Sequence, residues 1–144
     1  MMTYEYIVEM VAEVSPKEAF LAYTNPEIMK QWQPHLKTIE TIQKTLFQKG
    51  SRGVLVYQTH DDVMRMQVDV NLCEGHLFDV TYRVNGVVNR CINTFIKKNH
   101  QLLWTMIVQF YFEEEPAAKP SVFKKSTRQS MQQFIDYLQQ KASK

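Results

Sequence analysis

Long hydrophobic runs are absent from this chain of 144 residues. No apolar stretch approaches the roughly 20 residues that span a bilayer, so the sequence predicts no integral membrane association. The chain starts directly with a strand-like segment, and we interpret this start as lacking a signal peptide. Its two cysteines, Cys73 and Cys91, stand apart in strand-like segments. We therefore expect two reduced thiols and a cytoplasmic protein.

Charge of one sign is also scarce. Seventeen basic and fifteen acidic residues leave a formal net charge of +2, and the basic residues are spread along the chain. Such a small imbalance argues against nucleic acid or an anionic membrane surface as a partner. The densest basic cluster, formed by Lys124, Lys125 and Arg128, is interpreted as a solvated helix face.

The common catalytic and cofactor motifs are missing as well. The chain has no glycine-rich phosphate loop, no Gly-x-Ser-x-Gly elbow and no Cys-x-x-Cys pair. His60 is followed by Asp61 and Asp62, but neighbouring residues in one turn do not converge as zinc ligands do, so a solvated turn is the favoured interpretation. No nucleophile is paired with a base. We therefore expect no cofactor and no metal, assign no catalytic residue, and regard an enzyme as the less favoured class.

What the sequence does contain is a pattern of alternating segments that fits one domain over residues 1–144. Period-two alternation predicts seven strands, at residues 3–14, 37–47, 54–59, 64–72, 78–84, 87–96 and 102–112. Ser15-Pro16 and Asn25-Pro26 are typical starts of two short helices, the second ending near Trp32. Gly50 to Gly53 is expected to form a turn, and Asn85-Gly86 is a strong hairpin signal. The six later strands, joined by short turns, are expected to be antiparallel neighbours.

The last segment, Pro120 to about Lys141, has the spacing of an amphipathic helix. Its apolar stripe includes Phe123 near one end and Phe134 towards the other, with the small polar residues Thr127 and Ser130 between them. Two interpretations remain open for this stretch. Either the small side chains leave a void between helix and sheet, which we favour slightly, or large side chains from the strands fill it.

Local sequence adds a resemblance to a known superfamily. The segments that carry it are Val14-Ser15-Pro16-Lys17-Glu18-Ala19-Phe20, Asn25-Pro26-Glu27, Trp32, Pro34 and the turn at Gly53. They resemble the SRPBCC, or START-like and Bet v 1-like, superfamily, in particular its polyketide cyclase/dehydrase and heat-shock-ATPase-activator branches. The resemblance implies an α+β helix-grip fold with the order β-α-α-β6-α. In that fold a curved seven-stranded antiparallel sheet surrounds a long C-terminal helix, with a pocket between them.

Three functions follow as alternatives: binding of a small hydrophobic or amphipathic ligand, a cyclase- or hydrolase-like reaction that uses a pocket His or Tyr, and a co-chaperone-like protein interaction. We favour the first, with a monomer or homodimer as the assembly. His35 would lie at the pocket rim, although a partly exposed loop histidine is the simpler interpretation. The face on which Tyr57 lies is left open by its strand. The candidate ligand-binding residues are Trp32, His35, Tyr57, Met66, Val68, Tyr82, Trp104, Met106, Thr127, Ser130, Met131 and Phe134.

Overall fold

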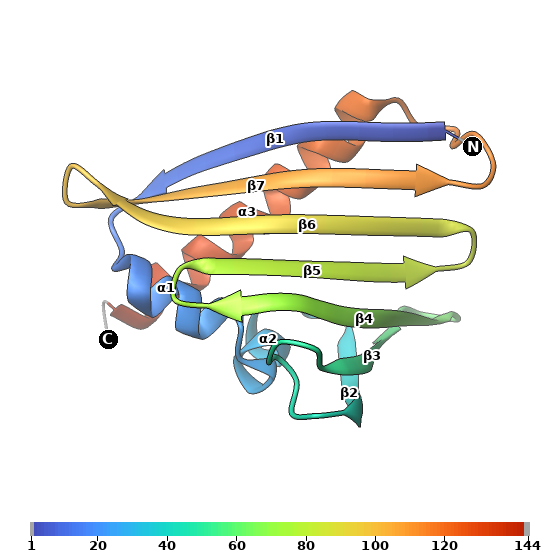
Figure 1. The fold of residues 1–144 in the computed structure, drawn as a ribbon, viewed down its shortest axis with the longest axis horizontal. Helices are drawn as coiled ribbons and strands as arrows, with labels where there is room; N and C mark the ends of the chain where they lie inside the picture. Colours follow the sequence, from blue (N-terminus) through green and yellow to red (C-terminus); the bar gives the residue numbers. More distant parts are fainter. Residues whose placement is uncertain (1, 143–144) are drawn as a thin grey trace.

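A computed structural model describes residues 2–142 (Figure 1). Its strands are β1 (Met2–Ala12), β2 (Leu36–Gln43), β3 (Arg52–Gln58), β4 (Val63–Glu74), β5 (Leu77–Val84), β6 (Val87–Lys98) and β7 (Gln101–Phe112). Its helices are α1 (Pro16–Tyr23), α2 (Pro26–Trp32) and α3 (Pro120–Ala142). This order confirms the predicted sequence of elements and the helix-grip architecture. No helix within residues 2–142 is both long and apolar enough to cross a membrane.

The strands form one antiparallel sheet in the order β1-β7-β6-β5-β4-β3-β2. Consecutive strands from β2 to β7 are neighbours, as their short turns require. The exception is β1, which pairs with β7 at the edge of the sheet opposite β2. The two short helices α1 and α2 therefore carry the chain from one edge of the sheet to the other (Figure 1).

Both short helices begin at the residues that the sequence predicts. The Ser15 side chain accepts a hydrogen bond from the amide of Glu18 at 3.3 Å, and Asn25 Oδ1 accepts one from the amide of Glu27 at 3.0 Å. These contacts satisfy amides that have no partner inside the helix. Pro16 and Pro26 each occupy the start of their helix, where a missing amide proton does no harm.

The long helix α3 crosses one face of the sheet diagonally (Figure 1). It is tied to β1 through side-chain hydrogen bonds: the hydroxyls of Tyr6 and Thr127 lie 2.7 Å apart, and Arg128 Nη1 lies 3.5 Å from the carbonyl oxygen of Glu9. The Tyr4 hydroxyl donates to the carbonyl of Ala118 in the segment before α3, at 3.0 Å. The sheet thus holds the N-terminal half of α3 by polar contacts as well as by packing.

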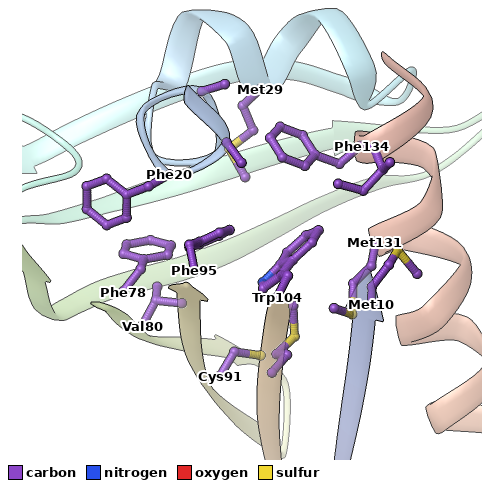
Figure 2. Packing of buried hydrophobic residues seen from close by; sticks show 14 of the residues in the cluster. Met10, Phe20, Met29, Phe78, Val80, Cys91, Phe95, Trp104, Met131 and Phe134 are labelled. Atoms are coloured by element: carbon purple, nitrogen blue, oxygen red, sulfur yellow. The ribbon is translucent and has the colours of Figure 1, made fainter. Parts of the chain in front are cut away.

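Buried apolar side chains from the sheet, α1, α2 and α3 pack together on the face of the sheet that carries the helices (Figure 2). Trp104 and Phe134 are completely buried there, and Phe95 and Phe78 are nearly so. Asn93 is also fully buried: its Oδ1 accepts from Trp104 Nε1 at 2.9 Å, and its Nδ2 donates to the Phe78 carbonyl at 3.2 Å. This polar bridge fixes the Trp104 ring within an otherwise apolar region.

The strand predicted at residues 37–47 is too long. β2 ends at Gln43, and Lys44 adopts a φ of 59°, which turns the chain out of the strand. Leu46 and Phe47 then fold back into the core, with 3% and 7% of their surfaces exposed. Gly53 was expected in a turn but lies inside β3, where a Cβ atom would come within 2.5 Å of the Glu40 carbonyl oxygen.

The alternation of β4 is interrupted near its C-terminal end. A bulge between Val70 and Leu72 shifts the register, so Cys73 lies opposite the buried Phe78 and Leu72 lies opposite Asp79. At the other end of the strand the alternation is regular: Met64 lies opposite Tyr57, on the same face of the sheet as Met66, and 43% of its surface is exposed.

Candidate functional site

An aromatic cluster, here called the helix-side cluster, fills one end of the space under α3. Tyr23 is at its centre, with its ring centroid 4.9 Å from that of Trp104 and 5.1 Å from that of Phe134. Trp32 lies against Phe134 at 5.1 Å in an edge-to-face arrangement. Rings packed in this way are rigid and leave little free space.

A second aromatic cluster, here called the far cluster, lies at the other end of α3. It contains Tyr4, Phe110, Phe112 and Phe123, with Phe123 from the first turns of the helix. The Phe123 ring lies 5.1 Å from Phe110, 5.5 Å from Phe112 and 5.6 Å from Tyr4. Helix α3 is therefore packed against aromatic rings at both ends.

A pocket of about 270 Å³ lies between the two clusters. It is bounded by Tyr23 and Trp32 of the helix-side cluster and by Phe110 and Phe123 of the far cluster. Its remaining lining comes from strands β3 to β7, α2 and the middle of α3: Met29, Gln33, Tyr57, Met66, Tyr82, Asn89, Cys91, Met106, Ser126, Thr127 and Ser130. Ser126 and Ser130 line the pocket and are also exposed to solvent, so the pocket opens to solvent beside α3.

Several polar groups of the lining already have hydrogen-bond partners within the protein. The Tyr57 hydroxyl donates to Gln33 Oε1 at 2.6 Å. Thr127 is engaged with Tyr6, and the Cys91 thiol lies 3.5 Å from Asn89 Oδ1. These pairs leave the corresponding groups satisfied without a bound molecule.

Three polar groups on aromatic side chains of the lining have no hydrogen-bond partner among residues 2–142. They are the hydroxyls of Tyr23 and Tyr82 and the indole Nε1–H of Trp32, which is fully covered by protein atoms. Burial raises the pKa of Tyr57 to about 12, and it also raises the pKa values of Tyr23 and Tyr82. All three phenols are therefore neutral over the physiological pH range.

Comparison with solved structures places this architecture among known proteins. Ara h 8.0201 superposes with a TM-score of 0.83 at 11% identity, over 96% of this chain and 99% of that one. A norcoclaurine synthase point mutant from Thalictrum flavum superposes with a TM-score of 0.70 at 12% identity, over 99% and 98% of the two chains. A Staphylococcus aureus protein of unknown function, SA2116, gives 0.72 at 15% identity, over 96% and 97%.

The chain has the Bet v 1-like fold. No family model matches the sequence, and no curated protein sequence does. At these identities the likeness concerns the fold alone, and that fold is the helix-grip architecture that the local sequence resemblance implies.

Within this Bet v 1-like fold, the residues proposed from the sequence lie in three places: the pocket, the packed core and an exposed loop. Seven of them line the pocket: Trp32, Tyr57, Met66, Tyr82, Met106, Thr127 and Ser130. Four lie in the packed core instead, with at most 1% of their surfaces exposed: Val68, Trp104, Met131 and Phe134. His35 is exposed in the loop before β2, where its carbonyl oxygen accepts from the Gln58 amide at 2.8 Å. A role in binding stays a prediction for all of them.

The structure adds pocket residues that the sequence interpretation did not single out. They are Tyr23, Met29, Gln33, Asn89, Cys91, Phe110, Phe123 and Ser126. The alternation of β6 and β7 indicates the inward face for Cys91 and Phe110, and the helical stripe includes Phe123. No comparable signal marks Gln33, which follows α2 and becomes part of the site only through Tyr57. Within residues 2–142, no group of three His, Cys, Asp or Glu side chains is arranged to hold a metal ion.

Proposed function

We propose that the protein binds a small hydrophobic or amphipathic molecule in the pocket between the sheet and α3. The observation that carries the proposal is the interruption of packing in the middle of α3. Aromatic rings fill the space at both ends of the helix, whereas Ser126, Thr127 and Ser130 face a pocket of about 270 Å³. A mostly apolar concavity with a few polar groups is the usual form of a small-molecule site.

The size and lining of the pocket support a ligand of modest dimensions. A buried apolar cavity of roughly 150 Å³ holds one benzene molecule, so a pocket of about 270 Å³ suits a molecule of about two fused rings. Methionines 29, 66 and 106 contribute flexible side chains that adapt to different shapes. Another protein with this fold, the norcoclaurine synthase mutant, was solved in complex with a transition-state analogue, so the fold accommodates a small molecule there.

The test is a titration with 6-propionyl-2-(dimethylamino)naphthalene, an uncharged two-ring dye that fluoresces strongly in apolar surroundings. We expect saturable binding to the wild-type protein. At a free dye concentration of 100 times Kd, binding stabilises the fold by about 2.7 kcal/mol, which raises Tm by roughly 5–10 °C for a chain of this length.

A matched pair of variants shows whether the dye occupies this pocket. Ser130→Phe places a ring in the pocket and should weaken dye binding at least about tenfold. Ser121→Phe makes the same substitution in the first turn of α3, outside the pocket lining, and should leave binding unchanged. No saturable binding to wild-type protein, or equal binding by both variants, would contradict the proposal.

Catalysis forms no part of this proposal. A cyclase- or hydrolase-like reaction needs a general acid or base whose pKa lies near the working pH. Burial moves the pKa values of the pocket tyrosines away from neutrality, and His35 lies outside the lining. The co-chaperone-like alternative draws on a different surface, the outer face of the sheet, and the pocket provides no support for it.

A further inference from the structure

Two hydroxyls of the pocket lining, those of Tyr23 and Tyr82, have no hydrogen-bond partner among residues 2–142. Each can donate a hydrogen bond to a bound molecule. The Trp32 Nε1–H also has no acceptor among these residues, but it is covered by protein atoms and does not meet the pocket space.

The Tyr82 hydroxyl is the donor best placed to meet a bound molecule. It lies on the pocket-facing side of β5, and it is not among the polar atoms sealed from solvent, as Trp32 Nε1 is. The hydroxyl of Tyr23, the last residue of α1, also lies in the pocket lining without a partner and is not sealed from solvent. Two free hydroxyls therefore face the same space, whereas the Trp32 N–H is covered by protein atoms.

Charged side chains are missing from this space. No Asp, Glu, Lys, Arg or His of the described chain lines the pocket, and burial keeps the three phenols neutral. A carboxylate or an ammonium group placed there would lose its hydration without gaining a counter-charge, which is strongly unfavourable. The lining therefore discriminates against ionised molecules, and its two free hydroxyls favour a molecule that carries a hydrogen-bonding atom.

We infer that the ligand is an uncharged molecule of about two fused rings that bears an acceptor oxygen, such as a ketone, ester or lactone, and that Tyr82 donates a hydrogen bond to that oxygen. This inference rests on the proposed function and specifies its ligand class. The Tyr23 hydroxyl is an additional donor on the same space, and the aromatic and methionine side chains contact the rings.

Three probes of matched size test the inference by calorimetric titration at pH 7: 2-acetonaphthone, which is neutral with a carbonyl oxygen, 2-ethylnaphthalene, which has no acceptor, and 2-naphthoate, which is anionic. We expect the ketone to bind the wild-type protein about tenfold more tightly than the hydrocarbon, and the anion to bind most weakly. Tyr82→Phe removes only the hydroxyl and should abolish the advantage of the ketone, while leaving the affinity for the hydrocarbon unchanged. Tyr111→Phe, on the outer face of the sheet, is the matched control and should bind all three as the wild type does.

The outcomes separate the inference from the proposed function. If the hydrocarbon binds as tightly as the ketone, if the anion binds best, or if Tyr82→Phe keeps the preference for the ketone, the inference is overturned and pocket binding stands. If none of the three probes binds the wild-type protein, both the inference and the proposed function are overturned. Circular dichroism of Tyr82→Phe establishes that the variant is folded, and its retained affinity for 2-ethylnaphthalene establishes that the pocket is intact.

Discussion

Replacing Asn93 by alanine is expected to destabilise the fold by about 2–4 kcal/mol. Asn93 has no exposed surface, and its amide bridges Trp104 Nε1 and the Phe78 carbonyl. The substitution leaves the Trp104 N–H buried without an acceptor, which costs about 1–3 kcal/mol, and it removes the second hydrogen bond, worth about 1 kcal/mol. The effect is large because Asn93 is fully buried, so both lost hydrogen bonds lie inside the core.

The measurement is thermal and urea-induced unfolding followed by far-ultraviolet circular dichroism. Near this chain length, each kcal/mol corresponds to roughly 2–4 °C in Tm, so Tm should fall by roughly 5–15 °C. The urea midpoint should fall with an unchanged slope, because the substitution changes the native state and not the surface exposed on unfolding.

A double-mutant cycle with Trp104→Phe isolates the hydrogen bond between the two side chains. Phenylalanine has no N–H, so the alanine substitution at position 93 no longer creates an unpaired donor in that background. We expect a coupling free energy of about 1–2 kcal/mol between the two positions. Additive effects, or a loss of less than about 0.5 kcal/mol in the single Asn93 variant, would refute the reasoning.

Three further predictions concern a close backbone contact, a buried thiol and an ion pair. Gly53→Ala should destabilise the protein by about 1–3 kcal/mol in urea unfolding, because its Cβ would meet the Glu40 carbonyl at 2.5 Å; an unchanged midpoint would contradict this contact. Burial raises the pKa of Cys91 to about 12. In a Cys73→Ser background, the reaction of Cys91 with Ellman's reagent at pH 8 should therefore be more than about 100-fold slower in the folded protein than in urea. Equal rates in the two conditions would contradict this prediction. For Asp79, burial alone would raise the pKa, but hydrogen bonds, chiefly from Arg90, outweigh it and lower the pKa. A carboxylate whose pKa is lowered in the folded protein contributes stability that is present above about pH 3.9 and is lost as the pH falls through its pKa in the folded state. Asp79→Asn should therefore flatten the acid limb of a Tm–pH profile. An unaltered acid limb would count against this linkage.

The order of elements could be predicted because each local signal has a direct physical cause. Ser15 and Asn25 offer oxygens to unpaired helix amides, and the strands alternate with a period of two. The end of β2 could not be predicted in this way. Leu46 and Phe47 are as apolar as strand residues, and only the positive φ of Lys44 turns them into the core.

The sequence predicts which strand residues lie on the inner face of the sheet, but it does not predict which of these residues line the pocket. Met66 and Val68 share the inner face of β4, and Met106 and Trp104 share that of β7, yet only the two methionines line the pocket. A step of two residues moves a side chain by about 6.6 Å along a strand, which carries it from the pocket into the packed core. Which stretch of a strand lies under the middle of α3 depends on the angle at which the helix crosses the sheet. That angle is a property of the assembled fold.

The two-ended attachment of α3 bears on how such a protein can change over time. Phe123, Phe134 and the Thr127–Tyr6 hydrogen bond hold the helix in place, so the architecture depends little on Ser126 and Ser130. Exchanges at Ser126 and Ser130 can therefore reshape the pocket lining while leaving the scaffold intact. A fold arranged in this way can acquire new preferences by neutral drift, and its shape can persist in chains that, like Ara h 8.0201, share only 11% of their residues with this one.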